Sequence, residues 1–196
     1  LYGVGNTHDL KRLFSVLAFN TGHEVSLEDL SQDSGIAKNT LRKYIEYLEA
    51  AFLIHRLPRL DQTARRLKRE THFKVYVTNP CLRAALFGPV AQDDRAMGAL
   101  VETALISQWA HFDSINSIFY SRWKNGEVDF VSLHKGTQRP ERVIEVKWSD
   151  RAIAEPRKEL KGVLEFARVN KMDQIIVATP SGEVEKEFTE IDGVKI

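Results

Sequence analysis

The sequence predicts an α/β (α+β) protein in two parts, a winged helix-turn-helix over residues 1–90 and an α-β-β-β-α-β domain over residues 91–196. Three observations support this prediction. Two short helical patterns joined by a glycine are followed by a pair of strands, three strand patterns then follow one another, and a strand-helix-strand pattern comes last. The stretch from Gly88 to Asp94 is expected to separate the two parts.

The composition is that of a globular protein. Of the 196 residues, 43% are hydrophobic and 28% are charged, which is ordinary for a folded domain. Cys81 is the single cysteine, and the six histidines are scattered without ligand spacing, so neither a disulfide framework nor a Cys-based zinc site is expected. No apolar run approaches the ~18 residues of a membrane span. We therefore expect a cytoplasmic protein that does not contact a membrane.

The basic residues are concentrated in the first part. Residues 1–90 contain 13 Lys and Arg against 9 Asp and Glu, a balance of +4, whereas residues 91–196 contain 15 against 18, a balance of −3. Cationic surfaces attract nucleic-acid phosphates. Of the two parts, the first is therefore the better candidate for contact with DNA.

The helix-turn-helix pattern comes first in the chain. Helices are expected to start at Asn6 or Thr7, at Ser26, and after Gly35. The apolar face of the third helix is expected to include Leu41, Tyr44 or Ile45, Leu48 and Phe52. Its basic face contains Lys38, Arg42 and Lys43, as a recognition helix would. An ordinary helical bundle has similar spacing, so that alternative stays open.

A strand pair after the third helix completes the winged-helix pattern. Residues 52–57 and 73–77 are expected to form the strands, with a loop over residues 58–68 between them. Basic side chains are frequent here: Arg56, Arg59, Arg65, Arg66, Lys68, Arg69 and Lys74. Such side chains can neutralise phosphates. Counting both elements, the expected DNA-binding residues are Lys38, Arg42, Lys43, Arg59, Arg65, Arg66, Lys68 and Arg69. The alternatives are a solvated loop and a basic patch that meets an acidic neighbouring domain.

The second part begins with a helix that carries one noteworthy acid. A short helix is expected over residues 79–88 and a longer one over residues 93–111. Glu102 lies beside the apolar stripe of the longer helix and is the only acid between Asp94 and Asp113. A solvent-facing position is the alternative reading of this side chain.

Three antiparallel strands are expected at about residues 115–123, 127–134 and 142–148. Asn125-Gly126 separates the first two, and this dipeptide favours a type I′ turn, in which both central residues have positive φ. A helix over residues 155–168 and a strand at residues 175–177 follow. Strand, crossover helix and strand form a βαβ unit, so the last strand is expected to be parallel to the third.

Asp129 and Glu145 are expected to converge on one face of this sheet. Facing side chains on neighbouring strands lie about 5 Å apart. Two carboxylates and the Lys147 ammonium on a half-buried face are costly unless something compensates them. A divalent cation, Mg²⁺ or Mn²⁺, held by the two acids would do so, with Lys147 directed at a bound water or phosphate. A salt bridge between Lys147 and either acid on a solvated face is the alternative.

This order of motifs resembles the PD-(D/E)XK nuclease-like core. With the preceding winged helix, it is similar to a family of unknown function that forms the C-terminal portion of bacterial and archaeal AAA-type ATPases. The segments that carry the resemblance are residues 39–49, 74–79, 127–131 and 144–147.

The resemblance implies a role for each acid. Asp129 and Glu145 would be metal ligands, Lys147 would orient or activate the attacking water, and Glu102 would match the acid that such nucleases place on the first core helix. The implied reaction is Mg²⁺-assisted hydrolysis of a phosphodiester. The implied ATPase domain is a further partner, and since this chain has no Gly-x-x-x-x-Gly-Lys-[Ser/Thr] sequence it has no P-loop site for ATP. Because the chain begins with Leu1, we expect it to be a piece of a longer protein.

Three functions remain open on the sequence alone. The first is a metal-dependent DNA nuclease guided by a winged helix within an ATPase. The second is a non-catalytic module of that ATPase that binds DNA or protein, since nuclease-like folds also serve in binding. The third is a transcriptional regulator. The sequence leaves the oligomeric state open.

Overall fold

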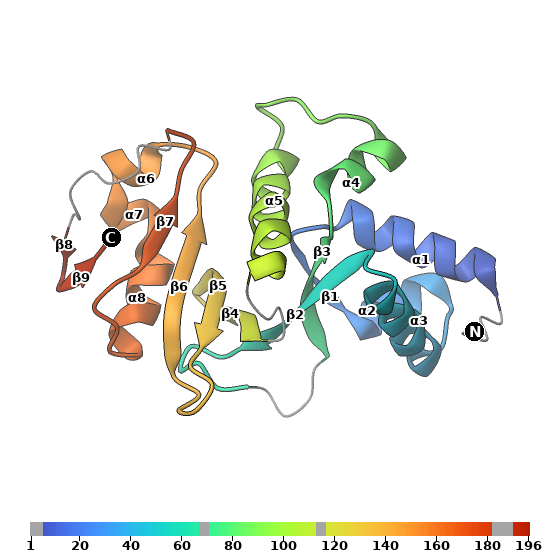
Figure 1. The fold of residues 1–196 in the computed structure, drawn as a ribbon, viewed down its shortest axis with the longest axis horizontal. Coiled ribbons are helices and arrows are strands. Elements are labelled where there is room, and N and C mark those ends of the chain that lie inside the picture. Colours follow the sequence, from blue (N-terminus) through green and yellow to red (C-terminus); the bar gives the residue numbers. More distant parts are fainter. Residues whose placement is uncertain (1–5, 67–70, 113–116, 182–189) are drawn as a thin grey trace. The chain divides into compact units, whose positions relative to one another are not determined.

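The computed structural model describes residues 6–66, 71–112, 117–181 and 190–196. It divides the chain into two compact units. The first unit contains Leu1–Leu57 and Arg69–Ile115, and the second contains Pro58–Lys68 and Asn116–Ile196. Both units are mixed α/β (Figure 1). This division differs from the expected boundary near residue 90, because the chain passes between the units three times.

The first unit contains five helices and parts of a sheet among its described residues. Its elements are α1 (Thr7–Phe19), β1 (His23–Ser26), α2 (Leu27–Ser34), α3 (Lys38–Ala50), the start of β2 (Ile54–Leu60), β3 (His72–Val77), α4 (Pro80–Phe87) and α5 (Ala96–Phe112). The strand order is β1-β3-β2, with β1 antiparallel to β3. The sequence analysis missed β1, which is only four residues long. The expected three N-terminal helices are confirmed.

Side-chain caps start the first two helices where the sequence indicated. Asn6 accepts hydrogen bonds from the amides of residues 8 and 9, and Ser26 accepts from those of residues 28 and 29. Gly35 ends α2 with φ of +70°, a left-handed conformation that glycine adopts without steric cost. The chain then enters α3 within three residues.

The expectation that Phe52 is buried is wrong. The helix α3 ends at Ala50, and Phe52 lies in the turn that leads into β2 with φ of +54°. Its side chain is 78% exposed. The rest of the expected apolar face is confirmed, and both alternatives at its centre are buried: Leu41, Tyr44, Ile45 and Leu48. The apolar spacing in the sequence thus extended two residues beyond the end of the helix.

The second unit contains a sheet of five strands in the order β2-β4-β5-β6-β7, counting the end of β2. Its elements are β4 (Ile118–Trp123), β5 (Gly126–Leu133), β6 (Pro140–Val146), α6 (Arg151–Ala154), α7 (Pro156–Glu159), α8 (Lys161–Val169), β7 (Ile176–Ala178), β8 (Glu190–Ile191) and β9 (Val194–Lys195). The pairs β4–β5 and β5–β6 are antiparallel, whereas β7 is parallel to β6. The three expected strands and the parallel fourth are confirmed.

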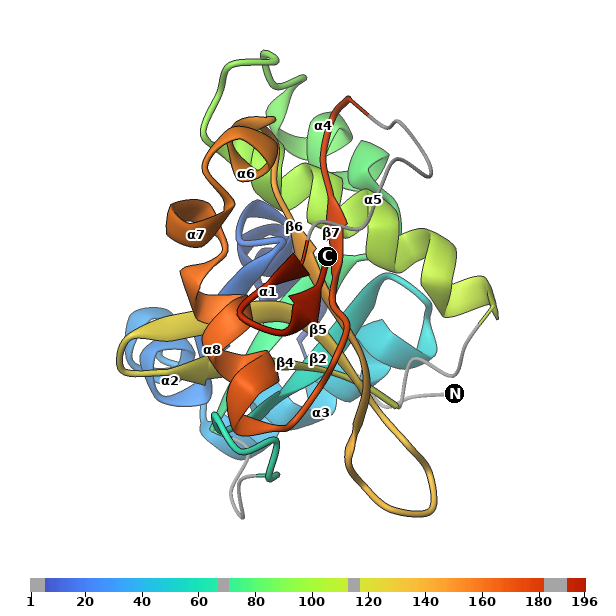
Figure 2. The same cartoon turned by 90° about the vertical axis from the view of Figure 1, so that its left-hand side faces the viewer.

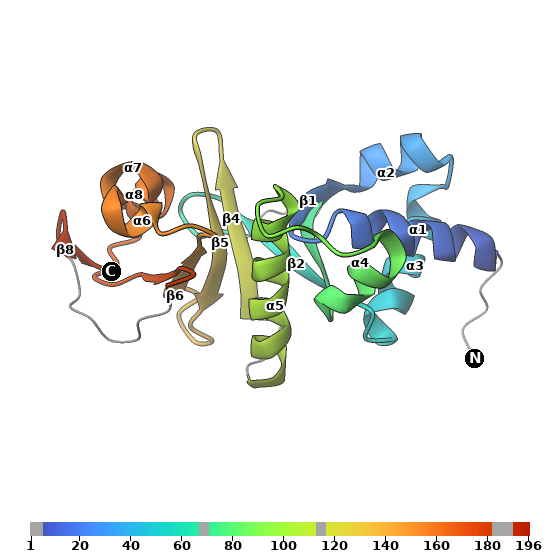
Figure 3. The ribbon, with the colours of Figure 1, turned by 90° about the horizontal axis from the view of Figure 1, so that it is seen from above.

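The crossover between β6 and β7 differs from the single helix that was expected. It consists of two short helices, α6 and α7, followed by α8, and the chain leaves helical geometry at Leu160. The helix α8 packs against β5 and β6 (Figure 3). Gly162 permits this close approach, because a Cβ on it would lie 3.0 Å from the carbonyl oxygen of Glu127.

The turn between β4 and β5 is present, but the reason expected for it is wrong. Trp123 pairs with Gly126, so Lys124 and Asn125 are the central residues. Neither Asn125 nor Gly126 has a positive φ. Gly126 has a different role: the indole of Trp123 lies across it, and a Cβ there would be 2.4 Å from the ring.

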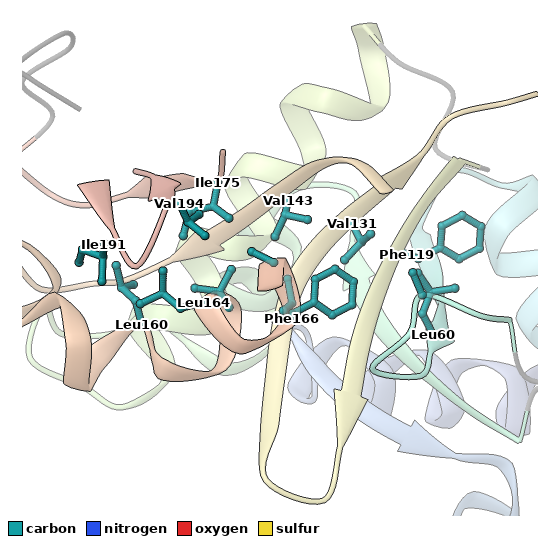
Figure 4. Close-up of a cluster of buried hydrophobic side chains, with 14 of the residues drawn as sticks. Leu60, Phe119, Val131, Val143, Leu160, Leu164, Phe166, Ile175, Ile191 and Val194 are labelled. Carbon is teal, nitrogen blue, oxygen red and sulfur yellow. The ribbon is translucent and has the colours of Figure 1, made fainter. Parts of the chain in front are cut away.

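The hydrophobic core of the second unit lies between α8 and the sheet (Figure 4). The loop after β2 contributes to this core through Leu60 and Ala64, which are buried. The Gln62 side chain donates a 2.6 Å hydrogen bond to Glu165 on α8, and Asn170 donates to the Gln62 carbonyl oxygen. The segment that was expected to form the tip of a wing on the first unit is therefore part of the second unit.

Candidate functional site

Asp129 and Glu145 lie on neighbouring strands of the second unit. The antiparallel register pairs Phe130 with Ile144, and its continuation by one residue places Asp129 opposite Glu145. Both acids are 7% exposed. The register thus makes the two acids neighbours across the strands, and a ligand shared by their carboxylates stays a prediction.

A β-bulge in β5 coincides with Asp129. Phe119 pairs with Val131 and Ser121 pairs with Val128, so two steps along β4 match three steps along β5. Because of the extra residue, side chains three positions apart on β5 can point to the same face of the sheet. Val128 and Val131 are both in the core that includes α8. Bulges of this kind redirect a side chain near functional sites. Simple alternation of side chains along the sequence does not predict the bulge at Asp129.

Hydrogen bonds fix both carboxylates. Asp129 Oδ2 accepts a 2.9 Å hydrogen bond from the amide of Val146, which is the last residue of β6. Glu145 Oε1 accepts a 2.7 Å hydrogen bond from Lys147 Nζ. The amide of Lys147 donates to the carbonyl oxygen of Ala178, which ties the end of β6 to β7 (Figure 2). Asp129, Glu145 and Lys147 thus form one cluster where the pairing of β5 with β6 ends.

Lys147 is a cation held by carboxylates. Burial lowers the pKa of Lys147, but the charge and hydrogen bond of Glu145 and the charges of Asp129 and Glu159 outweigh it, so this pKa is raised above its ordinary value. Lys147 therefore stays protonated at neutral pH. It can orient a water or an anionic oxygen.

One further acid, Glu159, was not among the residues predicted from the sequence. It is the last residue of α7, and its charge acts on Lys147. The sequence contains no signal for this approach, because it depends on the break between α7 and α8. In their ionised forms Asp129, Glu145 and Lys147 have a net charge of −1, and Glu159 makes it −2.

Asp129 and Glu145 could supply some, but not all, of the ligands of a hard cation such as Mg²⁺. Carboxylate oxygens are the ligands of Mg²⁺, which is commonly bound by one or two carboxylates and completes its shell with water and substrate phosphate. Within the described ranges, no group of three or more His, Cys, Asp or Glu side chains is arranged to hold a metal ion. The donor set therefore fits a cation shared with a phosphate better than a cation enclosed by protein.

Glu102 belongs to the first unit, unlike the other three predicted site residues. Its Oε2 accepts hydrogen bonds from Tyr76 Oη at 2.8 Å and from Lys74 Nζ at 3.2 Å. Both donors are buried on β3. Lys74, counted among the basic residues of the wing, is thus engaged in an ion pair with Glu102 that joins α5 to β3.

The basic residues of α3 are placed as predicted, with one difference among them. Arg42 and Lys43 are exposed. Lys38 is exposed too, but its ammonium pairs with Glu28 on α2. This ammonium lowers the pKa of the Glu28 carboxyl, through its hydrogen bond first and its charge second. A phosphate at Lys38 would have to compete with Glu28.

Of the described basic residues of the expected wing, Arg56 and Lys74 are in the first unit, whereas Arg59, Arg65 and Arg66 are in the second. Arg59 donates hydrogen bonds of 3.1 and 2.8 Å from Nε and Nη2 to the carbonyl oxygen of Arg122. The Arg66 guanidinium lies 4.6 Å from the ring centroid of Phe119, and Arg65 is exposed. Lys68 and Arg69 lie outside the described residues.

Residues 1–93 match the model of a family described as a domain of unknown function (DUF8612). That span covers α1 to α4, the larger part of the first unit. Searches of the curated proteins and of the solved structures gave no match. In the described ranges, no helix combines the length and the apolar character needed to cross a membrane.

Proposed function

We propose that the second unit is a metal-dependent phosphodiesterase of the PD-(D/E)XK type that acts on DNA. The observation that carries this proposal is the cluster of Asp129, Glu145 and Lys147, in which a bulge and a strand end bring two buried carboxylates and an ammonium together. Burying like charges is costly, and buried clusters of ionisable groups are frequent at functional sites.

Each residue of the cluster has a role in this proposal. Asp129 and Glu145 would hold Mg²⁺ or Mn²⁺, and the bound ion would supply charge neutralisation at the phosphodiester and acidify a water molecule. The amide of Val146 keeps Asp129 in place. Lys147, protonated at neutral pH, would hold the attacking water or a non-bridging phosphate oxygen.

The first unit would supply DNA binding. The helices α2 and α3 are joined at Gly35 and followed by β2 and β3, which is the element order of a winged helix-turn-helix. Arg42 and Lys43 would contact phosphates from α3. The wider proposal, which rests on resemblance, is that both units form the C-terminal region of an AAA-type ATPase.

Nicking of supercoiled plasmid DNA in the presence of Mg²⁺ or Mn²⁺ tests the proposal. We expect the Asp129→Asn and Lys147→Met variants each to lose about 100-fold or more of the nicking rate. Glu141→Gln is the matched control, because Glu141 is an exposed acid on β6, the strand that carries Glu145. Absence of nicking by the wild-type protein with both metals would refute the catalytic role.

A non-catalytic binding module is the second candidate. Lys147 already neutralises one carboxylate of the pair at 2.7 Å, and among the described residues no third acid joins the two as a ligand. A module of this kind would retain DNA binding, measured by fluorescence anisotropy, without cleaving the DNA. Calorimetric titration with Mn²⁺ then separates the two candidates. The enzyme requires saturable binding of Mn²⁺ that the Asp129→Asn substitution removes, whereas the binding module does not require it.

A further inference from the structure

The helix α4 buries a charged side chain and exposes apolar ones. Its single buried residue is Arg83, which is 9% exposed, whereas its apolar residues Leu86 and Phe87 are each 45% exposed. A surface helix normally turns its apolar side chains inward and its charges outward. The neighbouring helix α1 adds Val16, 38% exposed, and Phe19, 56% exposed. We call these five residues the α1–α4 patch.

The guanidinium of Arg83 is held against aromatic rings. It lies 5.4 Å from the centroid of Phe19 and 6.0 Å from that of Phe87, and the two rings meet edge to face at 5.2 Å. Cation–π contacts hold the position of a guanidinium but use none of its five N–H donors. Among the described residues, Arg83 makes no hydrogen bond and no ion pair. A nearly buried cation with its donors unused favours an anionic acceptor.

The surroundings of Arg83 indicate the kind of anion. Four of the five residues of the patch are apolar, and Arg83 is its single cation. Nucleic acid is bound by several cations that neutralise successive phosphates, and duplex DNA would leave Leu86 and Phe87 uncovered. Protein interfaces instead combine aromatic residues with arginine at their centre, where a carboxylate and its apolar neighbours can be buried together.

We propose that the α1–α4 patch binds a segment of a partner protein in which an Asp or Glu is flanked by apolar side chains. The carboxylate accepts hydrogen bonds from Arg83, and the flanking side chains cover Phe19, Leu86 and Phe87. This inference is independent of the proposed nuclease activity, because every residue of the patch belongs to the first unit.

Selection of a random dodecapeptide library on the full 196-residue chain tests the proposal. We expect the enriched peptides to share one acid between apolar residues. The most enriched sequence is then synthesised with capped ends and a fluorophore, and its affinity is measured by anisotropy. Replacing its acid with the corresponding amide should weaken binding about tenfold or more, as should Arg83→Met or Phe87→Ser in the protein. Lys11→Met, which removes an exposed cation of α1 outside the patch, should leave binding unchanged.

Arg83→Met should fold, because a methionine fills similar volume without a buried charge, and its melting temperature should equal or exceed that of the wild type. Phe87→Ser, at an exposed position, provides a second test if that variant does not fold. Enrichment of no peptide, enrichment of peptides without acids, or equal binding by the amide peptide would overturn the proposal. Competition by a 20-nucleotide DNA that depends on Arg83 would also overturn it, by assigning the patch to nucleic acid.

Discussion

At the scale of single residues, Gly126 is explained by an aromatic side chain and not by its backbone conformation. The Trp123 indole occupies the space of a Cβ on residue 126, and the same indole stacks on Phe166 of α8 at 6.2 Å. Asn-Gly in a sequence can therefore indicate either a turn with positive φ or a close contact between the glycine and a neighbouring side chain. Only the side chains packed around the turn distinguish them, and these come from distant parts of the chain.

Gly126→Ala is expected to destabilise the protein by about 1–3 kcal/mol, because the new methyl group displaces Trp123 from Phe166. Urea unfolding followed by Trp fluorescence measures the loss. Gly136→Ala is the matched control: its Cβ would lie 3.4 Å from the nearest atom, in the His134 side chain. It should change the free energy of unfolding by less than about 0.5 kcal/mol. Equal effects of the two substitutions would contradict the role assigned to Trp123.

The Glu28–Lys38 pair predicts a titration that can be followed by NMR. The pKa of the Glu28 carboxyl is lowered in the folded state, so the pair contributes stability above the ordinary carboxyl pKa and loses it as the pH falls through the lowered value. Lys38→Met should raise this pKa toward its ordinary range. Carboxyl ¹³C shifts measure the change, and Lys43→Met should leave the Glu28 titration as it is in the wild type.

At the scale of elements, the exposed face of α3 separates the basic residues into two groups. Arg42 and Lys43 are exposed, and among the described residues neither has an acidic partner such as Glu28, which pairs with Lys38. We expect Arg42→Gln and Lys43→Gln each to weaken binding to duplex DNA and to reduce the salt dependence by about one unit of slope. Lys38→Gln should have a smaller effect.

Fluorescence anisotropy across a range of salt concentrations measures both quantities for this set of variants. Lys11→Gln on α1 is the control for a general loss of positive charge. If Lys38→Gln weakened DNA binding more than either of the other two substitutions on α3, the pairing of Lys38 with Glu28 would not limit its contact with phosphate. The order of the effects therefore decides whether the ion pair restrains Lys38.

The elements that could be predicted from the sequence are those that depend on residues close to them in the chain. The cap at Ser26, the glycine stop at Gly35 and the strands around the Asp129–Glu145 pair depend on neighbouring residues, and all were located correctly. What could not be predicted depends on tertiary contacts. The bulge at Asp129 needs the register with β4, and the break at Leu160 comes directly before α8, which packs on β5 and β6.

At the scale of the whole molecule, the two units are not successive stretches of sequence. Leu60 and Ala64, which precede β3 of the first unit, belong to the core of the second unit. A fragment of residues 91–196, cut at the boundary that the sequence indicated, would lose both side chains. It would also lose the parallel pairing of β2 with β4.

We therefore expect the fragment 91–196 to unfold without the cooperative transition of the full chain. Near-ultraviolet circular dichroism and amide dispersion in NMR spectra are the measurements. A synthetic peptide of residues 54–68 should restore part of the ordered signal when it is added in excess. A fragment as stable as the full chain would show that the second unit does not need the loop after β2.

The interleaved division also bears on synthesis of the protein by the ribosome. When residue 115 emerges, every residue of the first unit has been translated, but Leu60 and Ala64 must wait for β4, α8 and the residues that follow before they can be shielded. The nascent chain therefore leaves these two apolar side chains uncovered until α8 has been translated, which is 105 codons after Ala64 (169 minus 64).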